Sequence, residues 1–188
     1  MAAPLTIIGI DPGLSGAVAI ITNAQEPPSP VLVWDTPVTT RIVNKKTRRV
    51  YDPPAMAQLL KATIARHAPT VAGQRNVLLA LEESMPMQHD GRVQAFGTGR
   101  SGGLWEGMLA MGGLPYRRVR AVDWKRAFGL LKQKKAASLA LARQWFPSVD
   151  LHLAKHEGRA EALLIAEWLR REYIRDGAVA RGPADDPG

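Results

Sequence analysis

The chain has 188 residues, of which 46% are hydrophobic and 22% charged, a composition typical of a single soluble globular domain. It contains no cysteine, which excludes disulfides, cysteine-ligated zinc or iron–sulfur sites and cysteine nucleophiles. Lys and Arg number 25 against 17 Asp and Glu, and the formal net charge of +8 favours a polyanionic partner such as a nucleic acid. The alternative is a basic surface that serves only solubility.

The sequence has neither a membrane-spanning run nor a signal-peptide pattern. Its apolar stretches fall well short of the roughly 20 residues that cross a bilayer. The N-terminus lacks the charged region and the cleavage site of a secretory signal. We therefore expect no membrane partner and a cytoplasmic location, in the interior of a bacterial or phage-infected cell.

The first quarter of the chain predicts three strands and a basic arm. Residues 4–11 are apolar on both faces, which is typical of a central strand. A Pro-Gly turn separates them from a second strand at residues 16–22, and a third strand is predicted at residues 31–35. Residues 41–50 carry several Lys and Arg and are predicted to form a hairpin arm or a loop.

The remainder alternates helices with strands. The Pro53-Pro54 pair precedes a helix, because proline is tolerated in a first helical turn. A fourth strand is predicted at residues 76–82, a glycine-rich helix at residues 92–111 and a fifth strand at residues 116–122. Further helices are predicted at residues 124–128, 134–145 and 158–173.

This order of elements predicts an α/β fold, a five-stranded mixed sheet with helices on both faces. The first three strands are expected to be antiparallel, and the later two to add in parallel through helical crossovers. We find no internal repeat. A single domain is expected over residues 1–175, followed by a flexible C-terminal tail over residues 176–188.

Two carboxylates, Asp11 and Glu82, each end a predicted strand. In the predicted topology these strand ends are neighbours at the sheet's C-terminal edge, where open α/β sheets place their sites. Asp11 stands before Pro-Gly and could instead serve only the turn. Glu83 competes with Glu82, since strand alternation turns only one of them toward the site. We favour Glu82, which continues the apolar run directly.

A second acidic pair opens the last predicted helix. Glu157 and Glu161 are four residues apart and share one helix face near the N-terminus, where the helix dipole favours negative charge. Residues 160–169 are apolar nearly all round, so this helix is expected to be buried. For Glu157 the alternative is a solvated acid at the helix start, and His156 is the alternative ligand in its place.

Carboxylates gathered in an apolar setting repel one another unless a cation neutralises them, because an unpaired buried charge is expensive. Hard oxygen ligands suit Mg²⁺ or Mn²⁺. The acids therefore predict a divalent metal site. The other aspartates considered are interpreted as turn and helix-cap residues: Asp35, Asp52, Asp123 and Asp150.

Three segments resemble motifs of one nuclease family. Residues 7–16, Ile-Ile-Gly-Ile-Asp-Pro-Gly-Leu-Ser-Gly, resemble the first-strand motif of RuvC-like Holliday-junction resolvases. Residues 79–83 resemble the acid-bearing fourth strand of these proteins, and residues 156–166 resemble the terminal helix of the phage-type members. These proteins share the RNase H-like fold, and the resemblance covers about residues 4–173.

The resemblance implies a metal-dependent crossover junction endodeoxyribonuclease of DNA recombination and repair. It would cut four-way junctions by paired symmetric nicks that leave 5′-phosphate and 3′-hydroxyl ends. Two Mg²⁺ or Mn²⁺ ions per active site would be held by Asp11, Glu82, Glu157 and Glu161, and two metals can activate water and stabilise a leaving oxygen. Many relatives carry aspartate in the terminal helix with varied spacing, so the choice between Glu157 and His156 stays open.

The substrate and assembly follow from the same resemblance. A four-way junction has twofold symmetry, so a homodimer is expected, with the helix at residues 91–113 as its interface. Packing within one monomer explains the glycines of that helix equally well. No nucleotide cofactor is expected. The residues predicted to grip DNA are Lys45, Lys46, Arg48, Arg49, Arg118, Arg120, Lys125, Lys132, Lys134 and Lys135.

Other functions compete with this one. A related nuclease that acts on forks or RNA–DNA hybrids would need the same acids, and only substrate shape separates the two. A non-cleaving junction-binding module would not need the complete acid set. Sugar- and acetate-kinase relatives of the actin-like ATPases begin with a similar strand, but they need a second domain and a second phosphate loop. For the basic clusters, the alternative is a solvated face.

Overall fold

The computed structural model describes residues 4–24, 29–43, 45–71, 73–86, 88, 90–134 and 136–180, the last four by backbone only. Its central sheet has five strands in the order β3-β2-β1-β8-β9. They are β1 (Thr6–Asp11), β2 (Ala17–Ile21), β3 (Val31–Asp35), β8 (Val77–Glu82) and β9 (Arg117–Val119). The first three pair antiparallel, whereas β8 and β9 add in parallel, so the predicted mixed sheet is confirmed.

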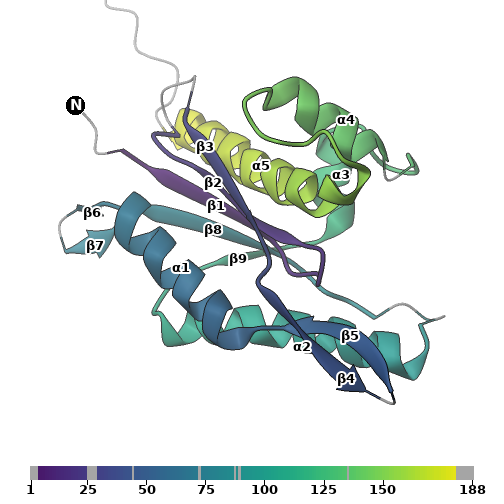
Figure 1. Cartoon of the computed structure of the whole chain (residues 1–188). Helices are drawn as coiled ribbons and strands as arrows, with labels where there is room; N and C mark the ends of the chain where they lie inside the picture. The colour runs from purple at the N-terminus through teal and green to yellow at the C-terminus, as the bar shows by residue number, and fades with distance from the viewer. Residues whose placement is uncertain are drawn as a thin grey trace, which may run out of the picture.

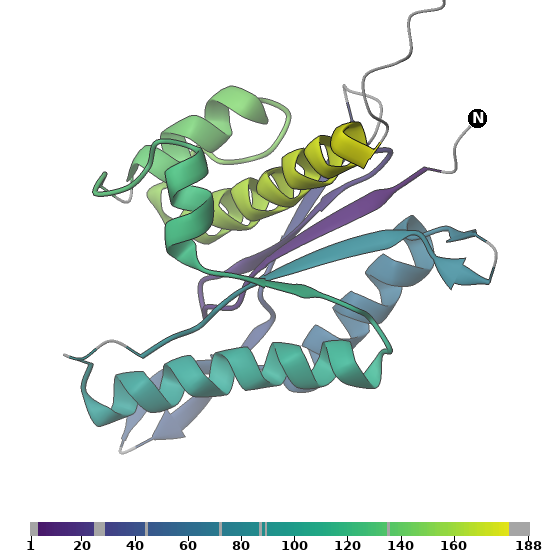
Figure 2. The same cartoon turned by 180° about the vertical axis from the view of Figure 1, so that it is seen from behind.

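Helices cover both faces of the sheet, as predicted (Figure 1; Figure 2 from behind). One face carries α3, α4 and α5, and the other carries α1 and α2. Their bounds are α1 (Pro53–His67), α2 (Arg92–Met111), α3 (Ala121–Ala127), α4 (Ala136–Trp145) and α5 (Glu157–Ala180). Asp52 caps α1 as interpreted, because its Oδ1 accepts the Ala55 N–H at 3.2 Å.

The central strand β1 is buried on both faces. Ile7 belongs to the core beneath α5, whereas Ile8 and Ile10 belong to the core beneath α1 and α2. Alternating side chains of one strand therefore serve two cores, which explains the unbroken apolar run in the sequence.

Helix α5 lies unusually close to β1, and glycines permit this. A Cβ at Gly9 would lie 2.4 Å from the carbonyl oxygen of Ala162, and a Cβ at Gly158 would lie 1.9 Å from the carbonyl oxygen of Ser15. Any larger residue would push the helix away. The start of α5 is thereby held against the turn between β1 and β2.

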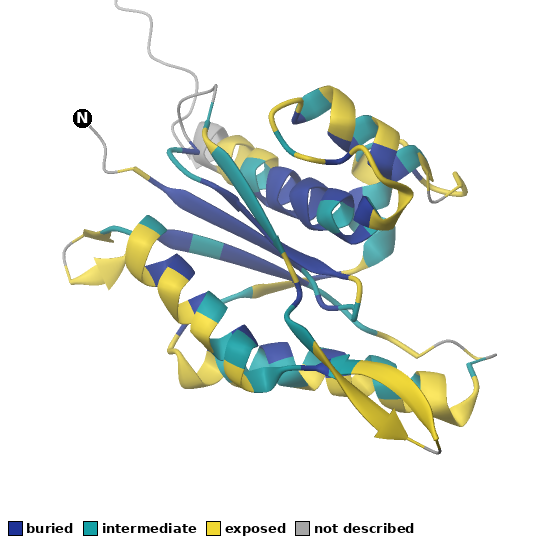
Figure 3. Cartoon of the chain, viewed as in Figure 1, coloured by how far each residue is buried: buried dark blue, intermediate teal, exposed yellow. Residues whose placement is uncertain are grey.

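The basic segment after β3 forms a hairpin that extends from the domain. Strands β4 (Val38–Val43) and β5 (Lys46–Tyr51) pair antiparallel as a separate two-stranded sheet. Most of its residues are exposed (Figure 3). Lys45 in its turn has a positive φ of 60°, a conformation more usual for Gly or Asn. The hairpin arm, rather than a loop, is the structure of this segment.

Three predicted boundaries are wrong in detail. The fifth strand ends at Val119, and α3 already begins at Ala121 rather than Trp124. The local reason is a helical first turn, in which the Asp123 N–H donates to the Arg120 carbonyl at 2.9 Å and the two side chains form a bidentate ion pair. Helix α4 begins at Ala136, later than predicted, and Lys135 lies outside the described residues.

Three short elements were not predicted from the sequence. A small hairpin joins β6 (Thr70–Val71) to β7 (Gln74–Arg75), and the 3₁₀ turn η1 (Ala154–His156) leads into α5. The backbone of α5 is helical through Ala180, within the predicted tail, and residues 181–188 lie outside the described residues. Among the helices of the described ranges, none is long and apolar enough to cross a membrane.

Candidate active site

Asp11 and Glu82 lie on neighbouring strands at the same edge of the sheet. In the parallel pairing of β1 with β8, Ile10 is opposite Leu81, so the two acids follow as the next residues of their strands. Asp11 is two residues beyond Gly9, which lies under α5, and Glu82 is two residues beyond Ala80 of the core beneath α5. Alternation therefore turns both carboxylates toward that helix.

Glu161 comes to this edge from α5. It lies one turn into the helix, beyond the close approach of Gly158 to the turn after β1. Its Oε1 forms an ion pair of 3.0 Å with Lys125 Nζ of α3. One cation therefore links the acid of the last helix to the helix that follows β9.

Glu82 is held by a buried indole. The Trp124 Nε1–H donates to Glu82 Oε1 at 2.9 Å, and the Trp124 side chain is fully buried. A tryptophan in the first turns of α3 can reach β8 because β9, which precedes α3, is the neighbouring strand. This hydrogen bond fixes the orientation of the carboxylate.

The pKa of Glu82 is raised by its burial and by two neighbouring carboxylates. Burial, and then the charges of Asp11 and Glu161, raise the pKa of Glu82 to about 7. The Trp124 hydrogen bond and the charge of Lys125 oppose this rise. Three carboxylates thus interact at one point, and a cation placed among them would relieve their repulsion.

Asp11 also stabilises its own turn. Its Oδ1 accepts the Gly13 N–H at 3.0 Å, an interaction typical of turn-forming aspartates. The turn role considered for Asp11 is therefore real, and it coexists with a position beside Glu82. The hydrogen bond orients the carboxylate at the strand end.

Glu157 and His156 differ in their surroundings. Glu157 is partly exposed at the first residue of α5. His156 is buried, with its Nδ1 3.6 Å from Asp150 Oδ1 and its ring 5.5 Å from the ring of His152. The described contacts of His156 therefore belong to the loop before α5. Which of the two residues completes the acid set stays a prediction.

The predicted DNA-binding cations fall into two groups. Several are paired within the protein, with Arg118 3.0 Å from Glu106, Arg120 2.8 Å from Asp123, and Lys125 bound to Glu161. Arg49 Nη2 donates to the Leu14 carbonyl at 2.9 Å, which ties the arm to the turn after Asp11. The remaining described members are exposed: Lys45, Lys46, Arg48, Lys132 and Lys134.

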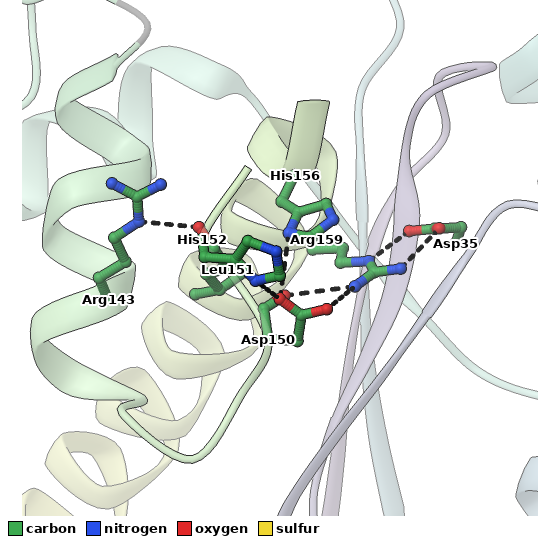
Figure 4. Close-up of polar contacts among 7 residues, drawn as sticks. All are labelled: Asp35, Arg143, Asp150, Leu151, His152, His156 and Arg159. Carbon is green, nitrogen blue, oxygen red and sulfur yellow. Dashed lines mark hydrogen bonds and ion pairs between the residues drawn. The ribbon is translucent and has the colours of Figure 1, made fainter. Parts of the chain in front are cut away.

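A second polar cluster lies beside the start of α5 (Figure 4). Arg159 donates to both carboxylate oxygens of Asp35, at 2.6 and 2.8 Å, and so ties α5 to the end of β3. This ion pair holds the pKa of Asp35 below its ordinary value. The interpretation of Asp35 and Asp150 as only turn and cap residues is too narrow. No local sequence pattern relates Asp35 to Arg159, because they are 124 positions apart.

A mixed α/β domain with a carboxylate site at the C-terminal edge of its central strands is thus defined. No family model matches the chain. Over 155 residues the chain is 36% identical to "Holliday junction resolvase MOC1, chloroplastic" of Chlamydomonas reinhardtii, an alignment that covers 73% of this chain and 17% of that protein. The chain thus spans about a sixth of the length of this relative. The predicted resemblance to Holliday-junction resolvases is confirmed in sequence.

Solved structures of RuvC from Thermus thermophilus are also similar to this chain. One is described as being in complex with a Holliday junction substrate and the other is RuvC alone. Each aligns with a TM-score of 0.49 and 16% sequence identity, over 92% of this chain and 97% of that chain.

Proposed function

We propose that this chain is a metal-dependent, structure-selective DNA endonuclease that resolves four-way junctions by paired symmetric nicks. The observation that carries the proposal is the convergence of Asp11, Glu82 and Glu161 at one edge of the sheet, where burial, and then the charges of the other two acids, raise the pKa of Glu82 to about 7. The sequence relationship to a protein named as a Holliday junction resolvase supports the choice of substrate. The net charge of +8 suits a DNA ligand.

The residues fit a hard divalent cation. Asp11, Glu82 and Glu161 offer only oxygen atoms, the ligands that Mg²⁺ and Mn²⁺ prefer, and their mutual repulsion is the charge excess that such ions offset. Glu157 is the proposed fourth ligand, from the same helix as Glu161. When bound, a pair of such ions would supply an activated water and charge stabilisation for hydrolysis of a phosphodiester.

The protein's own groups would prepare these ligands. The Trp124 indole orients Glu82 and favours its charged form, because a hydrogen bond to a carboxylate stabilises the anion. Lys125 holds Glu161 at 3.0 Å, and the Gly13 N–H holds Asp11 at 3.0 Å. Such positioning reduces the reorganisation needed during reaction.

Exposed cations lie on two segments of the chain. The arm contributes Lys45, Lys46 and Arg48, and the α3–α4 connection contributes Lys132 and Lys134. We propose that both contact phosphates of the junction. These contacts would position the DNA without reading its sequence. Arg49 would keep the arm near the active site through its bond to the turn after β1.

A homodimer through α2 is part of the proposal. Val93 and Phe96 are 89% and 71% exposed on this helix, and added Cβ atoms at Gly99, Gly103 and Gly107 would meet nothing within 4 Å. An apolar groove of about 650 Å³ runs between α1 and α2. An exposed apolar helix rich in glycine suits close packing against a second copy, and two active sites would match the twofold symmetry of a junction.

The catalytic domain is proposed to span residues 1–175, with residues 176–188 as a tail, and to act within a bacterial or phage-infected cell. The name of the relative assigns that protein to the chloroplast. Forks or RNA–DNA hybrids as substrates, or binding without cleavage, are the alternatives.

The test is cleavage of a labelled immobile four-way junction in Mg²⁺ or Mn²⁺, beside linear duplex, a fork and an RNA–DNA hybrid. Wild type is expected to nick the junction symmetrically, whereas Asp11→Asn is expected to bind it without cutting. Junction binding without cleavage by wild type in either metal would favour the binding module. Preferential cutting of the fork or hybrid would retain the chemistry and change the substrate.

A further inference from the structure

A cluster of two histidines and one aspartate lies where the loop after α4 meets the start of α5 (Figure 4). Asp150 and His152 come from the loop, and His156 comes from the 3₁₀ turn that leads into α5. One ligand atom from each of the three side chains lies within 4.8 Å of the other two. Asp150 and His152 are outside the proposed oxygen site of Asp11, Glu82 and Glu161. With Glu157 as the fourth ligand of that site, His156 belongs to this cluster instead.

The three side chains converge on one point. Nδ1 of His152 and Nδ1 of His156 both face Oδ1 of Asp150, and the His156 atom is 3.6 Å from it. In a tetrahedral zinc site with bonds of roughly 2.0–2.1 Å, neighbouring ligand atoms are about 3.3 Å apart. His156 and Asp150 are already near that separation. His152 is exposed and contacts Asp150 directly, so its ring can move outward to admit an ion.

His156 supplies an independent sign of an absent ligand. Its side chain is only 5% exposed, and its Nδ1 is buried without a hydrogen-bond partner in the described structure. Buried polar atoms normally find a partner, because an unsatisfied one costs free energy. This nitrogen faces Asp150 Oδ1 at 3.6 Å, beyond hydrogen-bond distance, so an ion at the centre of the cluster would satisfy it.

We propose that Asp150, His152 and His156 bind a divalent transition metal of the zinc class. Imidazole nitrogens favour Zn²⁺, Co²⁺, Ni²⁺ or Cu²⁺, whereas Mg²⁺ selects oxygen ligands. Two histidines and one carboxylate form a three-ligand set with a fourth position left for water. This site is therefore chemically distinct from the all-oxygen site proposed for catalysis.

The neighbouring charges are consistent with a bound cation. Arg159 contacts the cluster, with its Nη1 3.6 Å from Asp150 Oδ2, but Asp35 neutralises it through two short hydrogen bonds. Arg159 contacts Asp150 Oδ2, so Oδ1 of the same carboxylate remains directed toward the two histidines. Residues that hydrogen-bond to metal ligands commonly orient them in this way.

The position of the cluster indicates what the metal would do. It would join the α4–α5 loop to the residue directly before Glu157, and so would fix the N-terminus of the helix that carries Glu161. The exposure of Asp150 and His152 leaves the site accessible from solvent. Its role would be to stabilise the helix start rather than to contact DNA.

The test is direct metal binding by the full chain, purified free of metal and titrated with Co²⁺ and then with Zn²⁺. In excess Mg²⁺, which occupies the proposed oxygen site, wild type is expected to bind one Co²⁺ with visible absorption bands of a nitrogen- and oxygen-ligated ion. These bands are expected to disappear when Zn²⁺ displaces the Co²⁺. His152→Ala and Asp150→Asn are expected to lose more than the roughly 10–100-fold in affinity typical of removing an outer partner.

The controls separate this site from the rest of the protein. Asp11→Asn removes an oxygen ligand of the other site, and His67→Asn removes a histidine outside the cluster, so both are expected to bind Co²⁺ as wild type does. His152→Ala and Asp150→Asn alter exposed side chains, and circular dichroism would verify their folding. Zn²⁺ is expected to raise the thermal midpoint of wild type but not of these two variants. Absent Co²⁺ binding in wild type, or unchanged affinity in the two variants, would overturn the proposal.

Discussion

Trp124 donates its indole N–H to Glu82 across 2.9 Å, from the first turns of α3 to the end of β8. A second fully buried tryptophan, Trp105 of α2, has an indole nitrogen without a hydrogen-bond partner in the described structure. The two residues are therefore a matched pair. They have the same side chain and burial, but only one of them holds a carboxylate.

Replacement of Trp124 by Phe is expected to slow junction cleavage by roughly 10–100-fold, the equivalent of a hydrogen bond of about 1.5–3 kcal/mol to a charged group. Because this bond lowers the pKa of Glu82, its loss raises that pKa, and the acidic limit of cleavage should move to higher pH. A pH–rate profile with Mg²⁺ measures both effects. Trp105→Phe should leave the limit where it is, and equal shifts in the two variants would contradict the assigned role.

The raised pKa of Glu82 also makes the metal-free protein less stable at high pH. Between the ordinary pKa of 4.5 and the folded value of about 7, the folded protein keeps a proton that the unfolded chain releases. The contribution of this proton to the free energy of unfolding is therefore fully present below pH 4.5 and is lost as the pH rises through 7. Integrated over this range, the effect is about 3 kcal/mol.

Comparison with Glu82→Gln isolates this effect, because the histidine titrations are common to both proteins. We expect similar free energies of unfolding at pH 5 and a more stable Gln variant at pH 8, without divalent metal. Urea unfolding at the two pH values measures the difference. Mg²⁺ should remove the advantage of the variant at pH 8, and a difference that does not vary with pH would argue against a coupled Glu82.

The exposed lysines of the α3–α4 connection are expected to contact phosphate. Lys132→Ala with Lys134→Ala should weaken junction binding and lower the slope of log affinity against log salt by roughly 0.9 for each phosphate that is no longer neutralised. Fluorescence anisotropy at several salt concentrations measures the slope. Lys61 and Arg66 are exposed on α1 at the other face of the sheet, so their double alanine variant is the charge-matched control. An equal change in slope for both double variants would assign the loss to net charge alone.

The proposed dimer can be tested on the exposed face of α2. Phe96→Asp places a charge on a side chain that is 71% exposed in the monomer, so the fold should tolerate it while a paired apolar surface should not. Sedimentation velocity is expected to show a monomer, and cleavage of a cruciform plasmid should give single rather than paired nicks. Ile174→Asp alters an exposed apolar residue of α5 and should remain dimeric. A wild-type monomer, on free protein and on junction, would disprove the interface.

Local pattern was sufficient for most elements and for the placement of two acids. The apolar runs predicted β1 and β8, and Asp11 and Glu82 follow as the residues at their ends. The choice of Glu82 over Glu83 agrees with the face that the structure assigns it, although its catalytic role stays a proposal. The glycines, by contrast, could not be interpreted from the sequence. Gly158 permits close contact between α5 and the turn after β1, whereas a Cβ at Gly103 would meet nothing within 4 Å.

The sequence by itself determined the strand periodicity, the mixed sheet and the acids at the strand ends, because side-chain direction in a strand follows from a repeat of two. Only the tertiary structure decided which partners those acids meet. Trp124 reaches Glu82 and Lys125 reaches Glu161 because α3 and α5 dock on the same face of the sheet. Likewise, His156 faces Asp150 because the chain turns just before α5. Such contacts depend on the distance and rotation of packed elements, which no local repeat specifies.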